Sequence, residues 1–212
     1  MKKTFLFLTA GAMVLASCVG NPEGQRADTT DSVEVEGVAE GTELSVNTAE
    51  SRVEWLGKKV SGQHHGTVDI ASGTLLVNGD QLVGGHFVVD MNTITDLDLE
   101  GEYKEKLEAH LRSDDFFDVD NHPESTFEIT SVQEGSADSV IVVSGNLTIR
   151  GTSKNITFDA NVVELSETSA RITADFNIAR EDWGVNYAGQ ADDLISKEIN
   201  LKINLVAGAA SN

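Results

Sequence analysis

The sequence predicts an all-β domain behind a short N-terminal targeting segment, and three observations lead to this expectation. From Arg52 onward, apolar residues recur at every second position, which places them on one face of a strand and polar residues on the other. Turn signals separate these stretches at intervals of about ten residues, and one segment has helical periodicity. Roughly eight or nine half-buried antiparallel strands are expected, closed into a two-sheet sandwich or into a barrel that is either filled or able to hold one small ligand.

The composition excludes several functional classes. The 212 residues include 15 Lys plus Arg against 35 Asp plus Glu, so the formal net charge is -20. Because no basic surface is available to displace phosphate counterions, a nucleic-acid partner is not expected. The single cysteine excludes an intrachain disulfide, and no paired Cys/His spacing indicates a zinc finger or an iron–sulfur site. The length predicts one domain or at most two.

The first residues have the pattern of a secretory signal. Lys2 and Lys3 precede a mostly apolar stretch at residues 4–16, which is too short to span a bilayer. The stretch ends in Leu15-Ala16-Ser17-Cys18, which resembles the bacterial lipoprotein box, in which the cysteine is lipidated and the chain is cut before it. We therefore expect residues 1–17 to be a lipoprotein signal peptide and Cys18 to carry a membrane anchor. The alternative is an ordinary signal peptide followed by a free thiol.

An acidic segment connects this anchor to the β domain. Residues 19–43 contain seven acids, one base and no aromatic residue, a composition that cannot bury a core. We therefore expect residues 18–43 to be the lipidated cysteine with a flexible tether, and residues 44–212 to be the folded domain. Several acyl chains on Cys18 would hold the protein stably at a membrane. Val19 in place of an aspartate favours the outer membrane of the bacterial cell envelope, with the domain facing the periplasm.

Within the domain, strand patterns follow one another with short turns between them. Asn78-Gly79-Asp80 predicts a turn between strands at residues 75–77 and 82–87. A second hairpin is predicted at Gly151-Thr152-Ser153-Lys154. Alternation predicts further strands at residues 141–149, 156–162, 172–178 and 199–205.

One helix is predicted between these strands. Its apolar residues, four apart on one face, are Leu99, Tyr103, Leu107 and Leu111. We expect this face to pack on one end of the barrel. The glutamates of the same segment, Glu102, Glu105 and Glu108, are expected in solvent.

Three motifs resemble those of the YceI-like family. The first is HLRSDDFFDV at residues 110–119, followed by His122-Pro123 and Thr126-Phe127. The second is GNLTIRGTSK at residues 145–154, which resembles the family's hairpin, and the third is REDWGV at residues 180–185, which resembles its late turn. The resemblance covers residues 51–206 and leaves out the tether.

The resemblance implies an extended lipocalin-like antiparallel β-barrel with a helix near one end and a long apolar tunnel inside. Family members resemble carriers of polyisoprenoids or of other long-chain amphiphiles such as fatty amides, and they are periplasmic or secreted. This sequence departs from the pattern in its lipoprotein box. It also has Gly189-Gln190-Ala191 where relatives often carry an aromatic residue, which leaves open the width of the tunnel at residues 188–194.

A carrier of this kind gains affinity by burying apolar chain, at about 25 cal/mol per Å2, so its wall should be apolar. We expect the wall to include Trp55, Phe87, Phe116, Phe117, Phe127, Leu147, Phe158 and Phe176. Each of these side chains could instead fill a solid core. Phe116 and Phe117 are adjacent in the segment between helix and strand, where a mouth or lid is expected.

A polar head group would need a cation or a hydrogen-bond donor at the mouth of the tunnel. The candidates are His64, Arg112 and Arg180. Arg180 could instead pair with Asp182 or another acid and fix its turn, and Arg112 could form a local ion pair with Asp114 or Asp115, which follow it. His64 and His65 point to opposite faces of a strand, and the inward one could be a hydrogen-bonded core histidine.

An enzyme is the less favoured interpretation. A dense set of metal-ligating residue types is formed by His110, Asp114, Asp118, Asp120 and His122. The segment lacks the glycine and the distant glutamate of a calcium loop, and the sequence contains no HExxH or G-x-S-x-G motif. We therefore expect no catalysis, no metal and no cofactor, with a metal-dependent hydrolase as the weakest alternative.

The leading hypothesis is a membrane-tethered carrier that holds a polyisoprenoid or another long-chain amphiphile without changing it covalently. The main alternative is a filled barrel that acts as an interaction or stress-response scaffold, with its acidic surface docking a basic partner. The two hypotheses differ in the barrel interior, because only the carrier needs an open tunnel. The resemblance implies that carriers of this type can pair through exposed strand edges, so a homodimer is a further possible partner.

Overall fold

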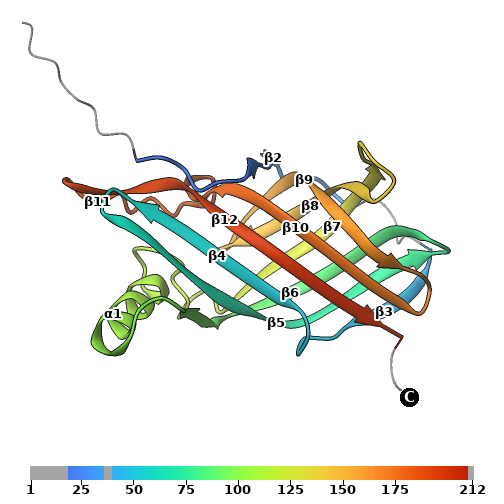
Figure 1. Cartoon of the computed structure of the whole chain (residues 1–212), viewed down its shortest axis with the longest axis horizontal. Coiled ribbons are helices and arrows are strands. Elements are labelled where there is room, and N and C mark those ends of the chain that lie inside the picture. The colour runs from blue at the N-terminus through green and yellow to red at the C-terminus, as the bar shows by residue number, and fades with distance from the viewer. Residues whose placement is uncertain (1–18, 36–39, 210–212) are drawn as a thin grey trace, which may run out of the picture.

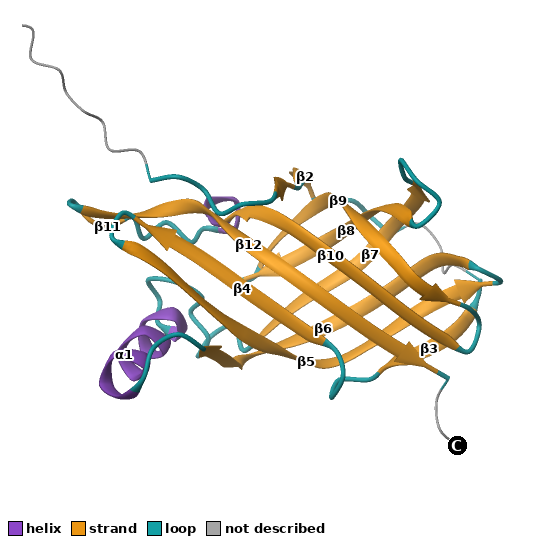
Figure 2. Ribbon diagram, viewed as in Figure 1, coloured by secondary structure: helices purple, strands orange, loops and turns teal. Residues whose placement is uncertain are grey.

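The computed structural model describes residues 19–35 and 40–209, so the expected signal peptide and Cys18 lie outside the described residues. Eight long strands form one closed antiparallel sheet (Figures 1 and 2). They are β4 (Arg52–Lys59), β5 (Gly62–Asn78), β6 (Gln81–Asp96), β7 (Glu124–Glu134), β8 (Val140–Ile149), β9 (Thr152–Leu165), β10 (Ser169–Ala179) and β12 (Asp193–Gly208). The ring closes because β4 pairs with both β5 and β12. The predicted barrel is confirmed, and the two-sheet sandwich is not adopted.

Two shorter strands extend the wall at opposite ends of the barrel. Strand β3 (Thr42–Val46) pairs with the last part of β5 and with the end of β12. Strand β11 (Gly189–Gln190) pairs with the start of β12. Register shifts in the pairing of β5 with β6 let these strands of 17 and 16 residues curve around the barrel. We call the two ends the β3 end and the β11 end.

Strand alternation explains which side chains face the interior. In β12, the predicted apolar residues Ile199, Leu201 and Ile203 face inward, and they stay partly exposed because they line a cavity. The intervening Asn200 is only 3% exposed. Burial on the outer face of a strand requires a cover, and here the cover is the N-terminal segment.

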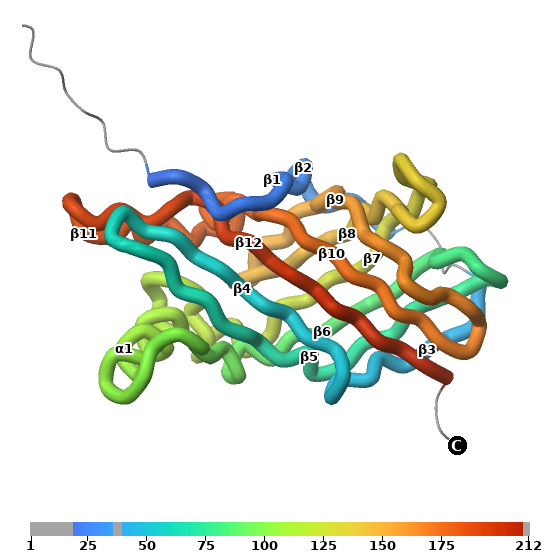
Figure 3. Tube along the Cα trace, in the orientation of Figure 1, coloured from blue at the N-terminus to red at the C-terminus, as the bar shows by residue number. Residues whose placement is uncertain are grey.

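Residues 19–35, which we call the strap, run along the outside of the barrel from near its β11 end (Figure 3). Strand β1 (Gln25–Arg26) pairs in parallel with β10, and β2 (Asp28–Asp31) pairs antiparallel with β9. The expectation of a flexible tether is therefore wrong for this part of the chain. The acidic composition predicted flexibility because it offers few apolar side chains to bury. The strap is nevertheless held, because its contacts with the barrel are mainly polar.

Polar side chains of the barrel hold the strap in place. The amide of Asn177, 1% exposed, donates a hydrogen bond to the Pro22 carbonyl at 3.0 Å, and the Asn177 carbonyl accepts one from Ala27 N–H at 2.9 Å. Gly24 has a φ of 137°, and a Cβ there would lie 2.6 Å from the Asn177 side-chain oxygen. Lys154 and Asp31 form an ion pair of 2.8 Å farther along. These contacts fix the strap without a hydrophobic core.

Helix α1 (Gly101–Arg112) packs against β6, and among the described residues no helix has the length and apolar character needed to cross a membrane. Leu111 is buried as predicted, at 8% exposure. Tyr103 is 75% exposed, so the predicted apolar face is wrong at the first turn of the helix. Glu108, expected in solvent, instead accepts hydrogen bonds from the Thr95 hydroxyl at 2.6 Å and from the Asp96 N–H at 3.0 Å.

These contacts predict a pH-dependent role for Glu108. Burial opposes its charged form, but the hydrogen bonds from Thr95 and Asp96, together with Lys104 and Arg112, outweigh burial and lower the pKa of Glu108. The stabilisation is therefore fully present above about pH 4.3 and is lost as the pH falls through the lowered pKa. We expect Glu108→Gln to reduce the free energy of unfolding by about 1 kcal/mol at pH 7, because the amide loses the charge-assisted bonds.

Urea unfolding of both proteins at several pH values measures this effect. The difference between wild type and Glu108→Gln should shrink as the solution is acidified below about pH 4.3. Glu105→Gln, on an exposed position of the same helix, is the matched control and should change stability little. A difference between wild type and Glu108→Gln that grows on acidification would contradict the assignment.

Candidate ligand cavity

A cavity of about 440 Å3 runs inside the barrel. Its wall includes Leu75 and Leu82 toward the β3 end and Lys59 and Asp193 toward the β11 end, so it extends along most of the barrel. The lining is mainly apolar, with polar side chains gathered at the β11 end. This interior contradicts the filled barrel that the scaffold alternative requires.

All eight residues predicted for the tunnel wall line this cavity. In the middle of the barrel the ring of Phe127 lies between Phe87, at 6.3 Å, and Phe158, at 5.8 Å, and Phe158 stacks on Phe176 at 4.1 Å. The alternation of the strands brings these rings to one interior although they come from β6, β7, β9 and β10. Their contact with a ligand stays a prediction.

Glycines on neighbouring strands make room for two of the large rings. A Cβ at Gly145 would lie 2.3 Å from the Phe127 ring, and a Cβ at Gly66 would lie 2.5 Å from the Trp55 ring. Both distances are far below van der Waals contact, so the rings can cross the inner face of the sheet only where no side chain is present. The glycines therefore help to keep Phe127 and Trp55 flat against the wall.

A second aromatic group lies where the cavity reaches the β11 end. The ring of Phe116 is 4.9 Å from His110 and 5.5 Å from Tyr187, and Phe117 is adjacent at 6.4 Å. The side chain of Arg150 holds this segment by donating a hydrogen bond to the Phe116 carbonyl at 2.9 Å. The segment between helix and strand therefore lies at the polar end of the cavity, where the sequence places a mouth or lid.

The charged residues that line the cavity are mostly cationic. Lys59 and Arg180 contribute positive charge, whereas Asp193 is the one acidic side chain of the lining within the described part of the chain. Lys58 also adjoins the cavity, but its Nζ donates a hydrogen bond at 3.4 Å to the Asn21 carbonyl of the strap, on the outside of the barrel. This bias is unusual in a chain with 15 Lys plus Arg against 35 Asp plus Glu. The hydrogen bond from Lys59, at 2.9 Å, and further ones from Ser61 outweigh desolvation and lower the pKa of Asp193. This ion pair joins the β4–β5 turn to the start of β12 at the rim.

The three predicted head-group residues have different surroundings. His64 lines the cavity, and its Nδ1 lies 2.9 Å from a carboxylate oxygen of Asp98. Arg112 does not line it, and its guanidinium donates a hydrogen bond to the Ile94 carbonyl at 2.6 Å and lies 3.8 Å from Glu108. The head-group prediction for Arg112 is therefore wrong, because the side chain attaches the helix to β6.

Arg180 lines the cavity but is only 3% exposed. It begins the short 3-10 helix η1 (Arg180–Trp183), and its guanidinium donates hydrogen bonds to the carbonyls of Ser196, at 2.9 Å, and Val185, at 2.6 Å. Burial lowers the pKa of Arg180. The alternative pairing with Asp182 is not found, since Asp182 pairs with Arg26 at 3.4 Å. Arg180 thus holds the loop around the cavity through backbone carbonyls.

Sequence reasoning missed several polar groups of the lining. Lys58 and Lys59 were detectable as adjacent cations before a turn in an acidic chain.

Two buried atoms, Trp55 Nε1 and Ser125 Oγ, make no hydrogen bond with any described residue, although both side chains line the cavity. A buried polar atom without a partner costs free energy, so these two atoms are exceptions to the otherwise apolar or hydrogen-bonded wall.

The residues weighed as metal ligands of a hydrolase do not come together. His110 lies 3.1 Å from Asp115 and packs against Tyr187, whereas His122 packs beside Gly151 and lies 3.9 Å from Asp118. Within residues 19–35 and 40–209, the group of His, Cys, Asp or Glu side chains with metal-ligand spacing is a different one, His64, Asp96 and Asp98. The hydrolase alternative therefore has no support from the structure.

Comparison with known proteins agrees with this architecture. The sequence pattern of the YceI-like domain matches residues 44–207. Protein YceI of Escherichia coli O17:K52:H18 is 27% identical over 214 residues, which cover 97% of this chain and 90% of that protein. A UPF0312 protein of Pectobacterium carotovorum is 32% identical over 100 residues, which cover 46% of this chain and 44% of that protein.

Solved structures share the fold at low sequence identity. Burkholderia cenocepacia BcnA matches with a TM-score of 0.64 and 18% identity, covering 76% of this chain and 99% of BcnA. A polyisoprenoid binding domain from Saccharophagus degradans, implicated in plant cell wall breakdown, matches with a TM-score of 0.62 and 18% identity, covering 81% of this chain and all of that domain. At this identity the likeness establishes the fold.

Proposed function

The chain belongs to the YceI-like domain family, and from this premise we propose that it is an extracytoplasmic lipid-binding protein that holds a polyisoprenoid or another long-chain amphiphile in its barrel. The observation that carries the proposal is the continuous apolar cavity of about 440 Å3 along the barrel. The polyisoprenoid-binding Saccharophagus degradans domain, which has the same fold, supports this ligand class.

The apolar wall supplies the affinity. Each methylene that moves from water into such a wall contributes about 0.8 kcal/mol, so affinity grows with the length of chain that the cavity accepts. The rings of Phe87, Phe127, Phe158 and Phe176 give a flat surface along the middle of this path. Binding needs no bond to be made or broken, so the protein carries or sequesters its ligand unchanged.

The polar end of the cavity sets the orientation of the ligand. Lys59 and Arg180 lie among the lining residues at the β11 end, so a phosphate, carboxylate or amide head group is favoured there and the apolar tail points toward the β3 end. The Tyr187 hydroxyl and His64 add polar groups to the same end.

The strap relates the mouth of the cavity to the proposed membrane anchor. Asn21 is held at the β11 end, since its carbonyl accepts a hydrogen bond from Lys58 at 3.4 Å and its side-chain oxygen accepts one from Ser196 at 3.0 Å. Cys18 precedes Asn21 by three residues, which span at most about 11 Å. A lipid on Cys18 would therefore hold the mouth of the cavity close to the bilayer. A long flexible tether would instead leave the barrel free to move away from the membrane. The exposed side chains of Val60 and Leu194, neighbours at the rim, would face the same surface.

The length of the cavity can be tested with Ala160→Phe. Ala160 lines the cavity beyond Phe158 as seen from the polar end and is 2% exposed, so a phenyl ring there would fill the deep part of the cavity. Losing room for two or three methylenes costs about 2 kcal/mol, so we expect about tenfold or greater weakening for the longest members of a fatty-acid or fatty-amide series and little change for the shortest. Displacement of a fluorescent lipid measures both affinities.

The matched control is Val163→Phe, which places the same ring on β9 at a position that is 61% exposed. It should bind the whole series like the wild type. Circular dichroism and thermal melting report whether Ala160→Phe still folds, and the comparison of short with long chains is internal to that variant. Equal affinity of wild type and Ala160→Phe for the longest chains would refute the proposed tail position.

The anchor is tested by Cys18→Ala in a bacterial host. Without the thiol no lipid can be attached, so the protein should move from the membrane fraction to the soluble fraction after cell lysis. Immunoblotting of the two fractions, with Ser17 left unchanged, measures this distribution. Continued association of Cys18→Ala with the membrane would show that the anchor has been assigned wrongly.

A further inference from the structure

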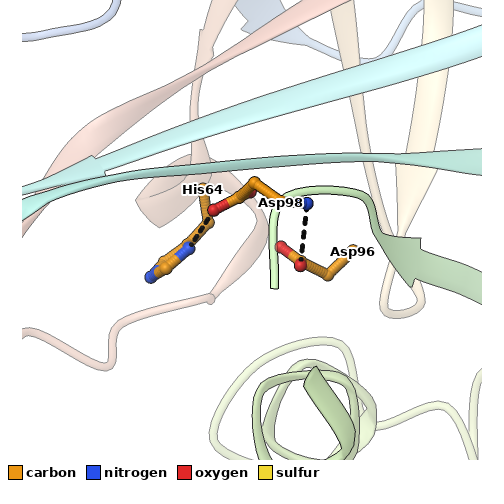
Figure 4. Close-up of side chains that lie close together, drawn as sticks. All are labelled: His64, Asp96 and Asp98. Carbon is orange, nitrogen blue, oxygen red and sulfur yellow. Dashed lines mark hydrogen bonds and ion pairs between the residues drawn. The ribbon is translucent and has the colours of Figure 1, made fainter. Parts of the chain in front are cut away.

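Three side chains from two neighbouring segments meet beside the mouth of the cavity. His64 belongs to β5, Asp96 is the last residue of β6, and Asp98 follows in the turn before α1 (Figure 4). One potential ligand atom from each side chain lies within 4.8 Å of the other two. The antiparallel pairing of Gly66 with Asp96 brings these segments side by side although His64 and Asp96 are 32 positions apart in the sequence.

Hydrogen bonds fix the two aspartates. One oxygen of Asp96 accepts the N–H groups of Asp98, at 3.1 Å, and Leu99, at 2.7 Å. One oxygen of Asp98 accepts the N–H of His65 at 2.7 Å, and the other lies 2.9 Å from His64 Nδ1. Burial opposes the charged form of Asp98, but these bonds from His65 and His64 outweigh it and lower its pKa. The carboxylate of Asp98 is therefore charged at neutral pH.

The second carboxylate oxygen of Asp96, Oδ2, accepts no hydrogen bond from the described residues. Asp96 is 0% exposed, so this oxygen is also buried. Figure 4 shows this free oxygen on the side of Asp96 that faces His64 and Asp98. A buried carboxylate oxygen without a partner is costly, and a cation at this point would satisfy it.

We propose that His64, Asp96 and Asp98 bind one divalent metal ion of the zinc class. A borderline metal accepts one imidazole and two carboxylates, whereas calcium and magnesium favour sites built from oxygen atoms alone. Zinc–ligand bonds of about 2.1 Å place tetrahedral ligand atoms about 3.4 Å apart, so the pair of His64 and Asp98 at 2.9 Å needs to open only slightly. The exposed position of Asp98 gives the ion access from solvent.

The position of the site gives the ion a role at the mouth. His64 also lines the cavity, so an ion bound to it adds positive charge at the same end as Lys59. Three protein ligands leave at least one position of a tetrahedral ion open. A head group that reaches the β11 end could occupy that position. The metal site itself does not depend on lipid binding and is tested without a lipid.

The experiment is a calorimetric titration of the purified chain with zinc chloride in excess calcium, which occupies weak carboxylate sites on the acidic surface. We expect one ion per chain and a rise in melting temperature when zinc is added. Asp96→Asn and His64→Gln should each weaken zinc binding by about tenfold or more and abolish that rise. Asp96→Asn keeps an oxygen for the N–H groups of Asp98 and Leu99, so its fold should be retained.

The matched control is Asp115→Asn, which alters a different His–Asp pair, between His110 and Asp115 at 3.1 Å, outside the site. It should bind zinc like the wild type. Failure of the wild type to bind zinc would overturn the proposal, as would equal zinc affinity of wild type, Asp96→Asn and His64→Gln. Stoichiometric calcium binding that His64→Gln leaves unchanged would also overturn it, because the imidazole would not be a ligand.

Discussion

Closure of the sheet by β4 is the constraint on which the rest of the structure depends. With β4 paired to both β5 and β12, each of the eight strands of the ring has two neighbours, and every second side chain of these strands is directed inward. In a ring of eight strands the inward side chains can either fill the interior or leave a small space. Here Gly66, Gly145, Ala160 and Ala174 alternate with large rings, and a cavity remains. The cavity is therefore a consequence of closure and residue size together.

The strap on the outside of the barrel is a second structural feature, and the acidic composition of residues 19–35 gave no sign of it. Asn177 and Asn200 occupy outward positions and are nearly fully buried, because the strap covers them and shares their hydrogen bonds. The strap fixes Asn21 near the rim of the cavity. A carrier that exchanges an apolar ligand with a bilayer benefits from a mouth held toward that bilayer, since the apolar chain then avoids water during transfer. The chain thus links its N-terminal segment to the polar end of its cavity.

The period of two predicts which strand residues face inward, but it left a sandwich and a barrel open, and the barrel was implied by the resemblance to the YceI-like family. Six of the eight predicted wall residues lie on strands and line the cavity for that reason, whereas Phe116 and Phe117 line it from the segment between α1 and β7. Contacts between polar groups that are far apart in the sequence leave no repeating pattern in it, so they could not be predicted. The docking of the strap on Asn177, the attachment of Arg112 to the Ile94 carbonyl and the meeting of His64 with Asp96 are of this kind. The predicted packing face of the helix was wrong for the same reason. Glu108 faces β6 and accepts a hydrogen bond from Thr95, whereas Tyr103 lies on the exposed side of the helix.

The most direct test of the central claim is native mass spectrometry of the whole chain purified from a bacterial host, followed by organic extraction and identification of the extract. The account predicts a stoichiometric co-purifying isoprenoid or long-chain amphiphile whose release leaves the fold intact. A bare mass, together with no uptake of added long-chain lipids, would contradict the account and leave the cavity of about 440 Å3 without a ligand of this class.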